Sequence, residues 1–131
     1  KMKKLKVKDI MSKDLVVIDK DATIHDAIEK MLSHEIHSLI VMDNDKPVGI
    51  VTINDVMVLM EKGESGTDIL VNEFMSNEII SIGPEEDLQK AVRIMIRNNI
   101  HRLPVIKDKK LMGIITSSDL MKVYQKGFMR K

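Results

Sequence analysis

Residues 49–55 read Gly-Ile-Val-Thr-Ile-Asn-Asp, and residues 113–119 read Gly-Ile-Ile-Thr-Ser-Ser-Asp. In both stretches a glycine opens an aliphatic run, and a threonine is followed three residues later by an aspartate. The aliphatic run is typical of a buried strand. Thr-x-x-Asp is typical of a helix start, because its hydroxyl and carboxylate can bond the first backbone N–H groups. The pattern therefore predicts, twice in one chain, a strand that passes directly into a helix.

The two stretches belong to a longer internal repeat with an offset of 64 residues. Adding 64 to each number from 7 to 60 leads to an equivalent residue between 71 and 124 without a gap, as for Met11 and Met75. Such self-similarity is the signature of a repeated structural unit. We interpret residues 1–62 as repeat 1 with an N-terminal segment, 63–70 as a linker, and 71–131 as repeat 2 with a basic tail.

Each repeat predicts the same order of elements. A short β-branched run (15–18 in repeat 1) precedes an amphipathic helical stripe, which begins after the N-cap residues Thr23 and Asp87. A hairpin with a polar turn follows, and then the second helix, which begins near Thr52 or Thr116. Because the hairpins are apolar on both faces, we expect an α+β fold of two β-α-β-β-α units packed sheet to sheet.

The composition predicts a globular chain. Its 131 residues are 44% hydrophobic and 31% charged, which is far from the signature of disorder. No stretch reaches the roughly 18 apolar residues of a membrane span, and no apolar secretory signal opens the chain. We therefore expect the cytoplasm and no membrane contact. The lack of cysteine excludes disulfides and thiolate chemistry.

The charge is nearly balanced, with 21 Lys and Arg against 20 Asp and Glu, so the whole chain has no strong field for polyanions. Nucleic-acid binding would depend on basic residues near the ends, namely Lys1, Lys3, Lys4, Lys6, Lys8 and the tail 122–131. The chain offers no aromatic platform for bases. We interpret these residues as solvated termini and expect no nucleic-acid partner.

Asp55 and Asp119 are the first candidate binding residues. An ionised aspartate only accepts hydrogen bonds and can take both hydroxyls of a ribose, while the threonine hydroxyl and the helix-start amides suit a phosphate. The alternative is that these residues only cap a helix. The second candidate is the pair His101-Arg102, whose forked cation suits a phosphate, whereas repeat 1 has His37-Ser38. Here the alternative is that each histidine satisfies a loop carbonyl and Arg102 extends into water.

Together, these motifs resemble those of tandem cystathionine-β-synthase-type (CBS) domains, also called a Bateman module. The resemblance rests on the doubled Gly-Ile-x-Thr-x-x-Asp stretches, the Ile-His-Arg-Leu-Pro-Val run from Ile100, and the Val-x-x-x-Met-Ser openings at Val7 and Val71. It covers nearly everything outside the two tails. The resemblance implies two clefts between the repeats that bind AMP, ADP, ATP, S-adenosylmethionine or methylthioadenosine.

The resemblance also implies which residues line each site. In the family the motif aspartate holds the ribose, and neighbouring hydroxyl residues contact ribose or phosphate. Site 1 is expected to comprise Met11, Val16, Ile36, His37, Thr52, Asn54 and Asp55. Site 2 is expected to comprise Met75, Ile80, Ile100, His101, Arg102, Pro104, Thr116, Ser118 and Asp119. Phosphate contacts in the family often cross to the other repeat, so the alternative is that His101 and Arg102 serve the ligand held by Asp55. The differences Ser38 against Arg102, Ile40 against Pro104 and Asn54 against Ser118 predict that the two sites are not equal.

We therefore expect a regulatory sensor that changes conformation when it binds an adenosyl ligand, forms a homodimer, and acts on an effector protein, fused or separate. Because each cleft is expected to be lined by both repeats, a ligand that prefers one arrangement would shift the population toward it. No catalytic residue and no required cofactor is expected, because the neighbours Ser118 and Asp119 diverge on a helix and cannot flank one imidazole. No metal site is expected from His25, His34, His37 and His101.

The alternative is an assembly module that binds no ligand. Its contact surface would be the apolar residues of the second helices, such as Val56, Leu59, Met60, Leu120 and Val123.

Overall fold

The computed structural model describes residues 4–127. It divides into two compact units that do not coincide with the sequence repeats. Unit 1 consists of residues up to Leu15 together with residues from Ile80 onward, and unit 2 is the continuous segment Val16–Ile79. The predicted boundaries at residues 62 and 71 concern the repeat in the sequence and stay a prediction, whereas the packing divides the chain after Leu15 and after Ile79.

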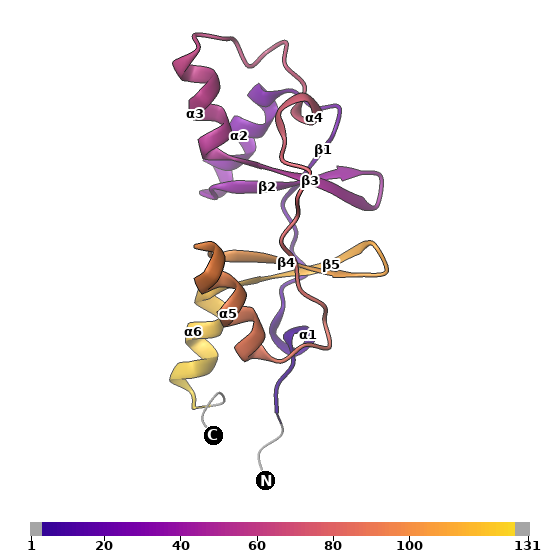
Figure 1. The fold of residues 1–131 in the computed structure, drawn as a ribbon, viewed down its shortest axis with the longest axis vertical. Coiled ribbons are helices and arrows are strands. Elements are labelled where there is room, and N and C mark those ends of the chain that lie inside the picture. Colours follow the sequence, from indigo (N-terminus) through magenta and orange to yellow (C-terminus); the bar gives the residue numbers. More distant parts are fainter. Residues whose placement is uncertain (1–3, 128–131) are drawn as a thin grey trace. The chain divides into compact units, whose positions relative to one another are not determined.

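Unit 2 is built around a three-stranded sheet (Figure 1). In the sheet order β1-β2-β3, the short β1 pairs in parallel with β2, and β2 and β3 form an antiparallel hairpin. The elements of this unit are β1 (Val17–Asp19), α2 (Ile24–His34), β2 (Ser38–Asp43), β3 (Lys46–Thr52), α3 (Ile53–Glu61) and the short helix α4 (Val71–Phe74).

Unit 1 repeats this arrangement with a two-stranded sheet. Its elements are the short helix α1 (Val7–Ile10), α5 (Leu88–Asn98), β4 (Arg102–Lys107), β5 (Lys110–Thr116) and α6 (Ser117–Gln125). The counterpart of β1 is a single parallel bridge between Ile82 and Val105. The difference between β1 and this single bridge has a physical reason in Pro84, the residue equivalent to Lys20. In unit 2 the Lys20 N–H donates to the Met42 carbonyl oxygen. Proline has no N–H, so this ladder cannot extend.

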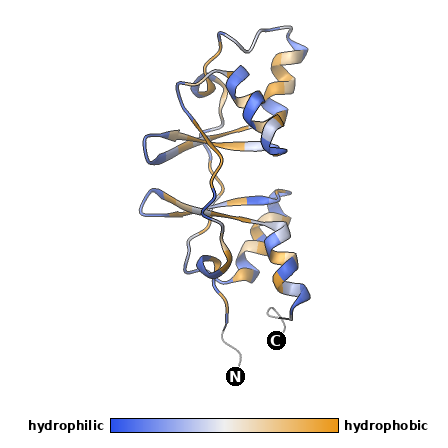
Figure 2. Cartoon of the chain, turned by 180° about the vertical axis from the view of Figure 1, so that it is seen from behind, coloured by the Kyte–Doolittle hydropathy of each residue, from blue (hydrophilic) through white to orange (hydrophobic). Residues whose placement is uncertain are grey.

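The first helix of each unit confirms the predicted stripe and cap. Thr23 accepts from the Asp26 N–H and Asp87 accepts from the Lys90 N–H, and both helices end at a residue with positive φ, Glu35 or Asn99. Figure 2 shows hydrophobic and hydrophilic residues on both helices. Two separate cores, one in each unit, bury most of the stripe, namely Ile24, Ala27 and Met31 in α2 and Leu88, Ala91 and Met95 in α5. Leu32 and Ile96, the last residues of the two predicted stripes, are instead 74% and 73% exposed. The protein thus has the predicted mixed α+β fold with two repeated β-α-β-β-α-like units.

The two sequence repeats exchange their opening segments. Segment 7–12 of repeat 1 packs in unit 1, where Ser12 and Ile114 exchange two backbone hydrogen bonds of 2.8 Å. Segment 71–76 of repeat 2 packs in unit 2, where Ser76 and Ile50 exchange bonds of 2.8 and 2.9 Å. Val7 and Val71 are fully buried in these units. Each core therefore depends on a segment that the sequence repeat assigns to the other copy.

Gly49 and Gly113 permit this exchange. A Cβ atom at Gly49 would lie 2.5 Å from Met75 Sδ and 2.7 Å from the Ser76 carbonyl oxygen. At Gly113 it would lie 2.8 Å from both Met11 Sδ and the Ser12 carbonyl oxygen. The glycines that open the two repeated stretches thus leave room for the crossing segment.

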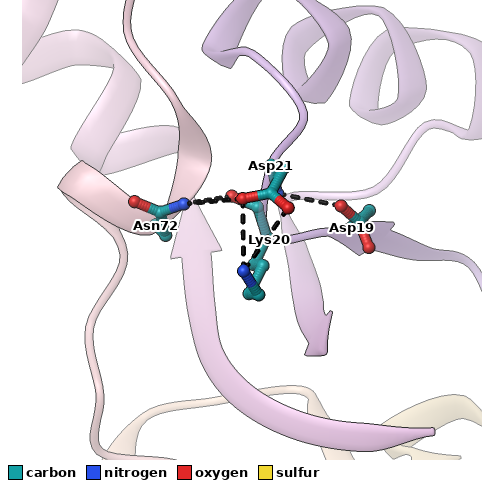
Figure 3. Close-up of polar contacts among 4 residues, drawn as sticks. All are labelled: Asp19, Lys20, Asp21 and Asn72. Atoms are coloured by element: carbon teal, nitrogen blue, oxygen red, sulfur yellow. Dashed lines mark hydrogen bonds and ion pairs between the residues drawn. The ribbon is translucent and has the colours of Figure 1, made fainter. Parts of the chain in front are cut away.

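Asn72 joins α4 to the loop that follows β1 (Figure 3). Its side-chain amide donates to the Lys20 carbonyl oxygen at 2.8 Å and to Asp21 Oδ1 at 3.3 Å. The Asp21 N–H donates to Asp19 Oδ2 at 2.9 Å, and the Lys20 ammonium donates to Asp21. The hydrogen bond to Asp21 and the charge of this carboxylate raise the pKa of Lys20.

Unit 1 fastens its segment with ion pairs at the equivalent place. The Lys8 and Lys6 ammonium groups donate to Glu85 at 3.1 and 3.3 Å. Their hydrogen bonds lower the pKa of Glu85, with Lys8 contributing most. Lys8 and Glu85 occupy the positions that Asn72 and Asp21 hold in unit 2.

Within residues 4–127, no helix is both long and apolar enough to cross a lipid bilayer.

Candidate functional site

The repeated Thr-x-x-Asp stretches form capping boxes at the starts of α3 and α6. In unit 2 the Thr52 N–H donates to Asp55 Oδ2 at 2.8 Å, and the Asp55 N–H donates to Thr52 Oγ1 at 3.3 Å. In unit 1 the corresponding bonds between Thr116 and Asp119 measure 3.0 and 3.2 Å. The capping interpretation is therefore confirmed for both helices.

Capping uses only one oxygen of each carboxylate. Asp55 Oδ2 accepts from the Thr52 N–H and also from the Thr52 hydroxyl, at 3.2 Å, and Asp119 Oδ2 accepts from the Thr116 N–H. Among the described residues, no hydrogen bond ends on Oδ1 of either aspartate. Both aspartates are half-buried. One oxygen of each carboxylate can therefore accept a hydrogen bond from a ligand while the other holds the helix start.

The first backbone amides of α3 and α6 are largely occupied. The N–H groups of Ile53 and Ser117 donate to the carbonyl oxygens of His37 and His101, at 3.0 and 2.9 Å. The third amide of each helix donates to the threonine hydroxyl. Among the first three, only the second amide of each helix has no protein acceptor in the described part of the chain. These helix starts offer a phosphate less than the sequence suggested.

The two histidines contribute to this arrangement through the backbone. The side chains of His37 and His101 are exposed and make no hydrogen bond to any other described residue. Their carbonyl oxygens tie the start of each hairpin to the start of the following helix. The alternative that each histidine ring satisfies a loop carbonyl is therefore not found among the described residues.

Arg102 is the main chemical difference between the units. It is half-buried at the start of β4, directly opposite Thr116 on β5, while its counterpart Ser38 lies opposite Thr52. Partial burial lowers the pKa of the Arg102 guanidinium, and the charge of Asp119 opposes this shift. An arginine remains protonated under such conditions. Unit 1 thus combines a partly desolvated cation with a carboxylate, and unit 2 has the carboxylate alone.

Most of the other predicted site residues lie in the same units as their aspartates. Val16 and Ile36 pack against the core of unit 2, and Ile100 packs against the core of unit 1. Ile80 is 40% exposed. Pro104 is buried, and its carbonyl oxygen accepts from the Ile82 N–H at 3.0 Å. Asn54 and Ser118 are exposed beside the motif aspartates.

Met11 and Met75 belong to the compact units opposite to those of their predicted sites. Met11 packs against Gly113 in unit 1, and Met75 packs against Gly49 in unit 2. The exchange of opening segments causes this difference. The two glycines had no predicted structural role, although a glycine at equivalent positions beside both aliphatic strands is a signal for a close backbone approach.

The structure corrects the proposed assembly surface. Val56, Leu59 and Leu120 are core residues with 8%, 4% and 5% exposure, and Val123 packs against the core of unit 1. They lie on the inner face of their helices, because the i, i+3 stripe that looked available in the sequence faces the sheet. Met60 is 69% exposed and remains available.

The basic residues of the N-terminal segment are partly neutralised within unit 1. Lys4 lies 3.4 Å from Asp87, and Lys6 and Lys8 pair with Glu85. Lys1, Lys3 and the tail from residue 128 lie outside the described residues.

The histidines considered as metal ligands are not brought together. His34 Nδ1 lies 3.0 Å from the Lys30 carbonyl oxygen. In the described ranges, no three His, Cys, Asp or Glu residues are grouped to hold a metal ion.

Comparison with known proteins agrees with this architecture. The CBS domain family matches residues 7–62 and again 71–126. A CBS domain pair in complex with 5′-methylthioadenosine and S-adenosyl-L-methionine superposes with a TM-score of 0.80 at 26% identity, covering 95% of this chain and 99% of that one. CBSX2 in complex with AMP gives a TM-score of 0.80 at 25% identity, covering 92% and 96%.

Curated relatives include regions of larger enzymes. Inosine-5′-monophosphate dehydrogenase from Methanocaldococcus jannaschii is 32% identical over 89% of this chain, which spans 23% of the length of that enzyme. The chain also spans less than two thirds of the length of several other curated relatives. The family matches cover most of the chain, and they coincide with the doubled motifs and capping boxes. The chain therefore belongs to the CBS domain family and carries two of these domains in tandem.

Proposed function

We propose that this CBS pair is a non-catalytic regulatory module that binds adenosine derivatives at the starts of α3 and α6. The observation that carries the proposal is the half-buried motif aspartate of each unit, whose Oδ1 accepts no hydrogen bond from the described residues. A ribose offers two hydroxyl donors to such an acceptor. The ligands of the similar CBS pairs, AMP in one and S-adenosyl-L-methionine with 5′-methylthioadenosine in another, support the adenosyl class.

The two units are proposed to prefer different ligands. Arg102 beside Asp119 suits a ligand that carries a phosphate, such as AMP, because the guanidinium can donate two parallel hydrogen bonds to it. In unit 2 the equivalent Ser38 has no charge, so a ligand without phosphate, such as methylthioadenosine or S-adenosylmethionine, is expected there. One module would then report on two adenosyl compounds.

A ligand at either site would touch the connections between the units. Val16 and Ile80 are predicted site residues, and they are the first residues after the chain passes from one unit to the other. A ligand that packs on them restricts the conformations of these connections. If one conformation binds the ligand better, the population shifts toward it, and an effector protein, fused or separate, can respond.

Isothermal titration calorimetry with AMP, methylthioadenosine and S-adenosylmethionine tests the proposal. Asp119→Ala should abolish AMP binding, and Asp55→Ala should abolish binding of the ligand without phosphate. Asp87→Ala and Asp26→Ala are matched controls, because these residues cap α5 and α2 but lie outside the predicted sites. Each substitution should cost about 1 kcal/mol of stability. Unchanged binding by Asp55→Ala and Asp119→Ala would refute the ribose assignment.

A second candidate function is assembly without a ligand. It is favoured by apolar side chains on the outer faces of the helices, among them Met57 and Met60 on α3 and Met121 and Tyr124 on α6, which are 56–69% exposed. Such residues are typical of an interaction surface. We propose that the chain forms a homodimer through this surface, with or without a bound ligand. Dimers that give no heat with any adenosyl compound would favour assembly over sensing.

A further inference from the structure

The two units carry opposite charge, although the chain as a whole is nearly neutral. Residues 4–15 and 80–127, the described part of unit 1, contain 13 Lys and Arg against 7 Asp and Glu, a formal charge of +6. Unit 2 contains 4 Lys and no Arg against 13 Asp and Glu, a formal charge of −9. The division into compact units reveals this contrast.

The outer helix faces of the two units keep the same apolar positions. Leu32 on α2 and its counterpart Ile96 on α5 are 74% and 73% exposed. On the second helices, Met57 and Met60 correspond to Met121 and Tyr124, and all four are exposed. Residues three or four apart lie on one helix face. Each unit therefore has an apolar strip on its outer helices.

The charges beside these strips are reversed between the units. Glu29 lies one turn before Leu32 on α2, while the equivalent residue on α5 is Arg93, one turn before Ile96. The next position on the same face is Ser33 in unit 2 and Arg97 in unit 1. Glu29, Arg93 and Arg97 are exposed and form no ion pair with another residue of the described chain. Their charges are available to a partner.

From this reversal we infer that the homodimer pairs unlike units. The α2–α3 face of unit 2 in one copy docks on the α5–α6 face of unit 1 in the second copy. This contact joins the two apolar strips and places Glu29 of one copy near Arg93 and Arg97 of the other. Pairing of like units would oppose equal charges, which disfavours that arrangement. The inference rests on the proposed assembly and is independent of the proposed ligand.

Charge reversal separates the two pairing modes. Under unlike pairing, Arg93→Glu places two glutamates together and Glu29→Arg places arginines together, so each variant should weaken the dimer roughly tenfold. Under like pairing, Arg93→Glu only exchanges an arginine pair for a glutamate pair, and little should change. The dissociation constant is measured by sedimentation equilibrium without added nucleotide, at low and at high salt.

Two rescues complete the test. An equimolar mixture of the Arg93→Glu and Glu29→Arg proteins should recover most of the affinity of the parent chain, because positions 29 and 93 again carry opposite charges in each contact, while Arg97 is unchanged. The double variant Glu29→Arg/Arg93→Glu should recover it within one chain. Thermal unfolding of every variant checks that the fold is intact. The controls Lys110→Glu and Asp45→Lys change the net charge equally, on exposed hairpin positions away from these helices, and should leave the dimer unchanged.

Several outcomes would overturn the inference. These are a parent chain that stays monomeric at all concentrations, a dimer indifferent to either reversal, and a mixture that fails to recover affinity. A parent chain that instead binds a DNA duplex, and loses this binding with Arg93→Glu, would assign the basic face to a nucleic acid. Calorimetry with adenosyl compounds on the same proteins reports separately on the ligand proposal.

Discussion

Single residues with two roles explain why the candidate site was visible in the sequence but not fully interpretable. Thr-x-x-Asp predicted both a cap and a ribose site, and the structure confirms the cap while leaving Oδ1 of Asp55 and Asp119 accessible to a further donor. Capping is a local interaction, so spacing alone predicts it. The use of the first helix amides by His37 and His101 depends on how the hairpin returns to the helix, and spacing could not predict it.

Arg102→Ser should make the site of unit 1 resemble that of unit 2. The affinity for AMP should fall by about tenfold to a hundredfold, since a charge-assisted hydrogen bond contributes roughly 1.5–3 kcal/mol. The affinity for adenosine, which has no phosphate, should change little. Calorimetry with both compounds gives the comparison, and an equal loss for the two would contradict a phosphate role. Lys110→Ser serves as the control, because Lys110 is an exposed cation at the start of β5, outside the predicted site.

Gly49→Ala and Gly113→Ala should destabilise the protein. The added methyl group meets a backbone carbonyl oxygen at 2.7 or 2.8 Å, so the crossing segment must move. Overpacking of this kind typically costs about 1–3 kcal/mol of the free energy of unfolding. Gly83→Ala is the control, since the nearest atom to its Cβ would lie at 3.8 Å. Urea denaturation of the three variants measures the difference, and equal stabilities would argue against the close approach.

At the level of elements, helices were easier to predict than the sheet edge and the opening segments. The stripes of α2 and α5 are amphipathic and start at good caps, so local pattern was sufficient. The four-residue helices α1 and α4 are too short for a periodic signal. Unit 1 lacks the first strand because Pro84 has no N–H to donate. This effect could not be predicted from the sequence, because it depends on the hydrogen bond that the equivalent Lys20 makes in unit 2.

The attachment of α1 should depend on pH through Glu85. Lys8 and Lys6 lower the pKa of Glu85 in the folded protein below its ordinary value of 4.5. The ion pairs of Glu85 therefore stabilise the fold fully above pH 4.5, and this stabilisation is lost as the pH falls through the pKa of Glu85 in the folded protein. Glu85→Gln should therefore remove part of the loss of stability on acidification below pH 4.5. Urea denaturation across this range provides the measurement. An identical acid dependence in both proteins would show that these ion pairs do not fasten the segment.

For the whole molecule, the repeat predicted two similar units but not which segments build them. An offset of 64 residues relates Val7 to Val71 equally well whether each segment packs in its own unit or in the other one. Only tertiary contacts, such as the bonds between Ser12 and Ile114, distinguish these arrangements. The charge contrast between the units was hidden for the same reason, because counting over the whole chain cancels it.

A fragment of residues 16–79 should be more stable than a fragment of residues 1–62. The former contains all of unit 2, including α4 and the buried Val71, whereas the latter lacks this segment and carries one that packs in unit 1. Both have nearly equal length, so chain size does not explain a difference. Thermal unfolding followed by circular dichroism compares them. A higher melting temperature for residues 1–62 would contradict the exchange.

The exchange of opening segments bears on the ancestry of the chain. A gene that encoded a single repeat could complete such a unit only as two polypeptides, each lending its first residues to its companion, which is a domain-swapped dimer. Duplication and fusion through the linker would have placed both halves on one polypeptide and turned a concentration-dependent association into an intramolecular one. Once fused, the two halves were free to diverge, and the present contrast between Ser38 and Arg102 is the kind of difference that an identical pair could not acquire.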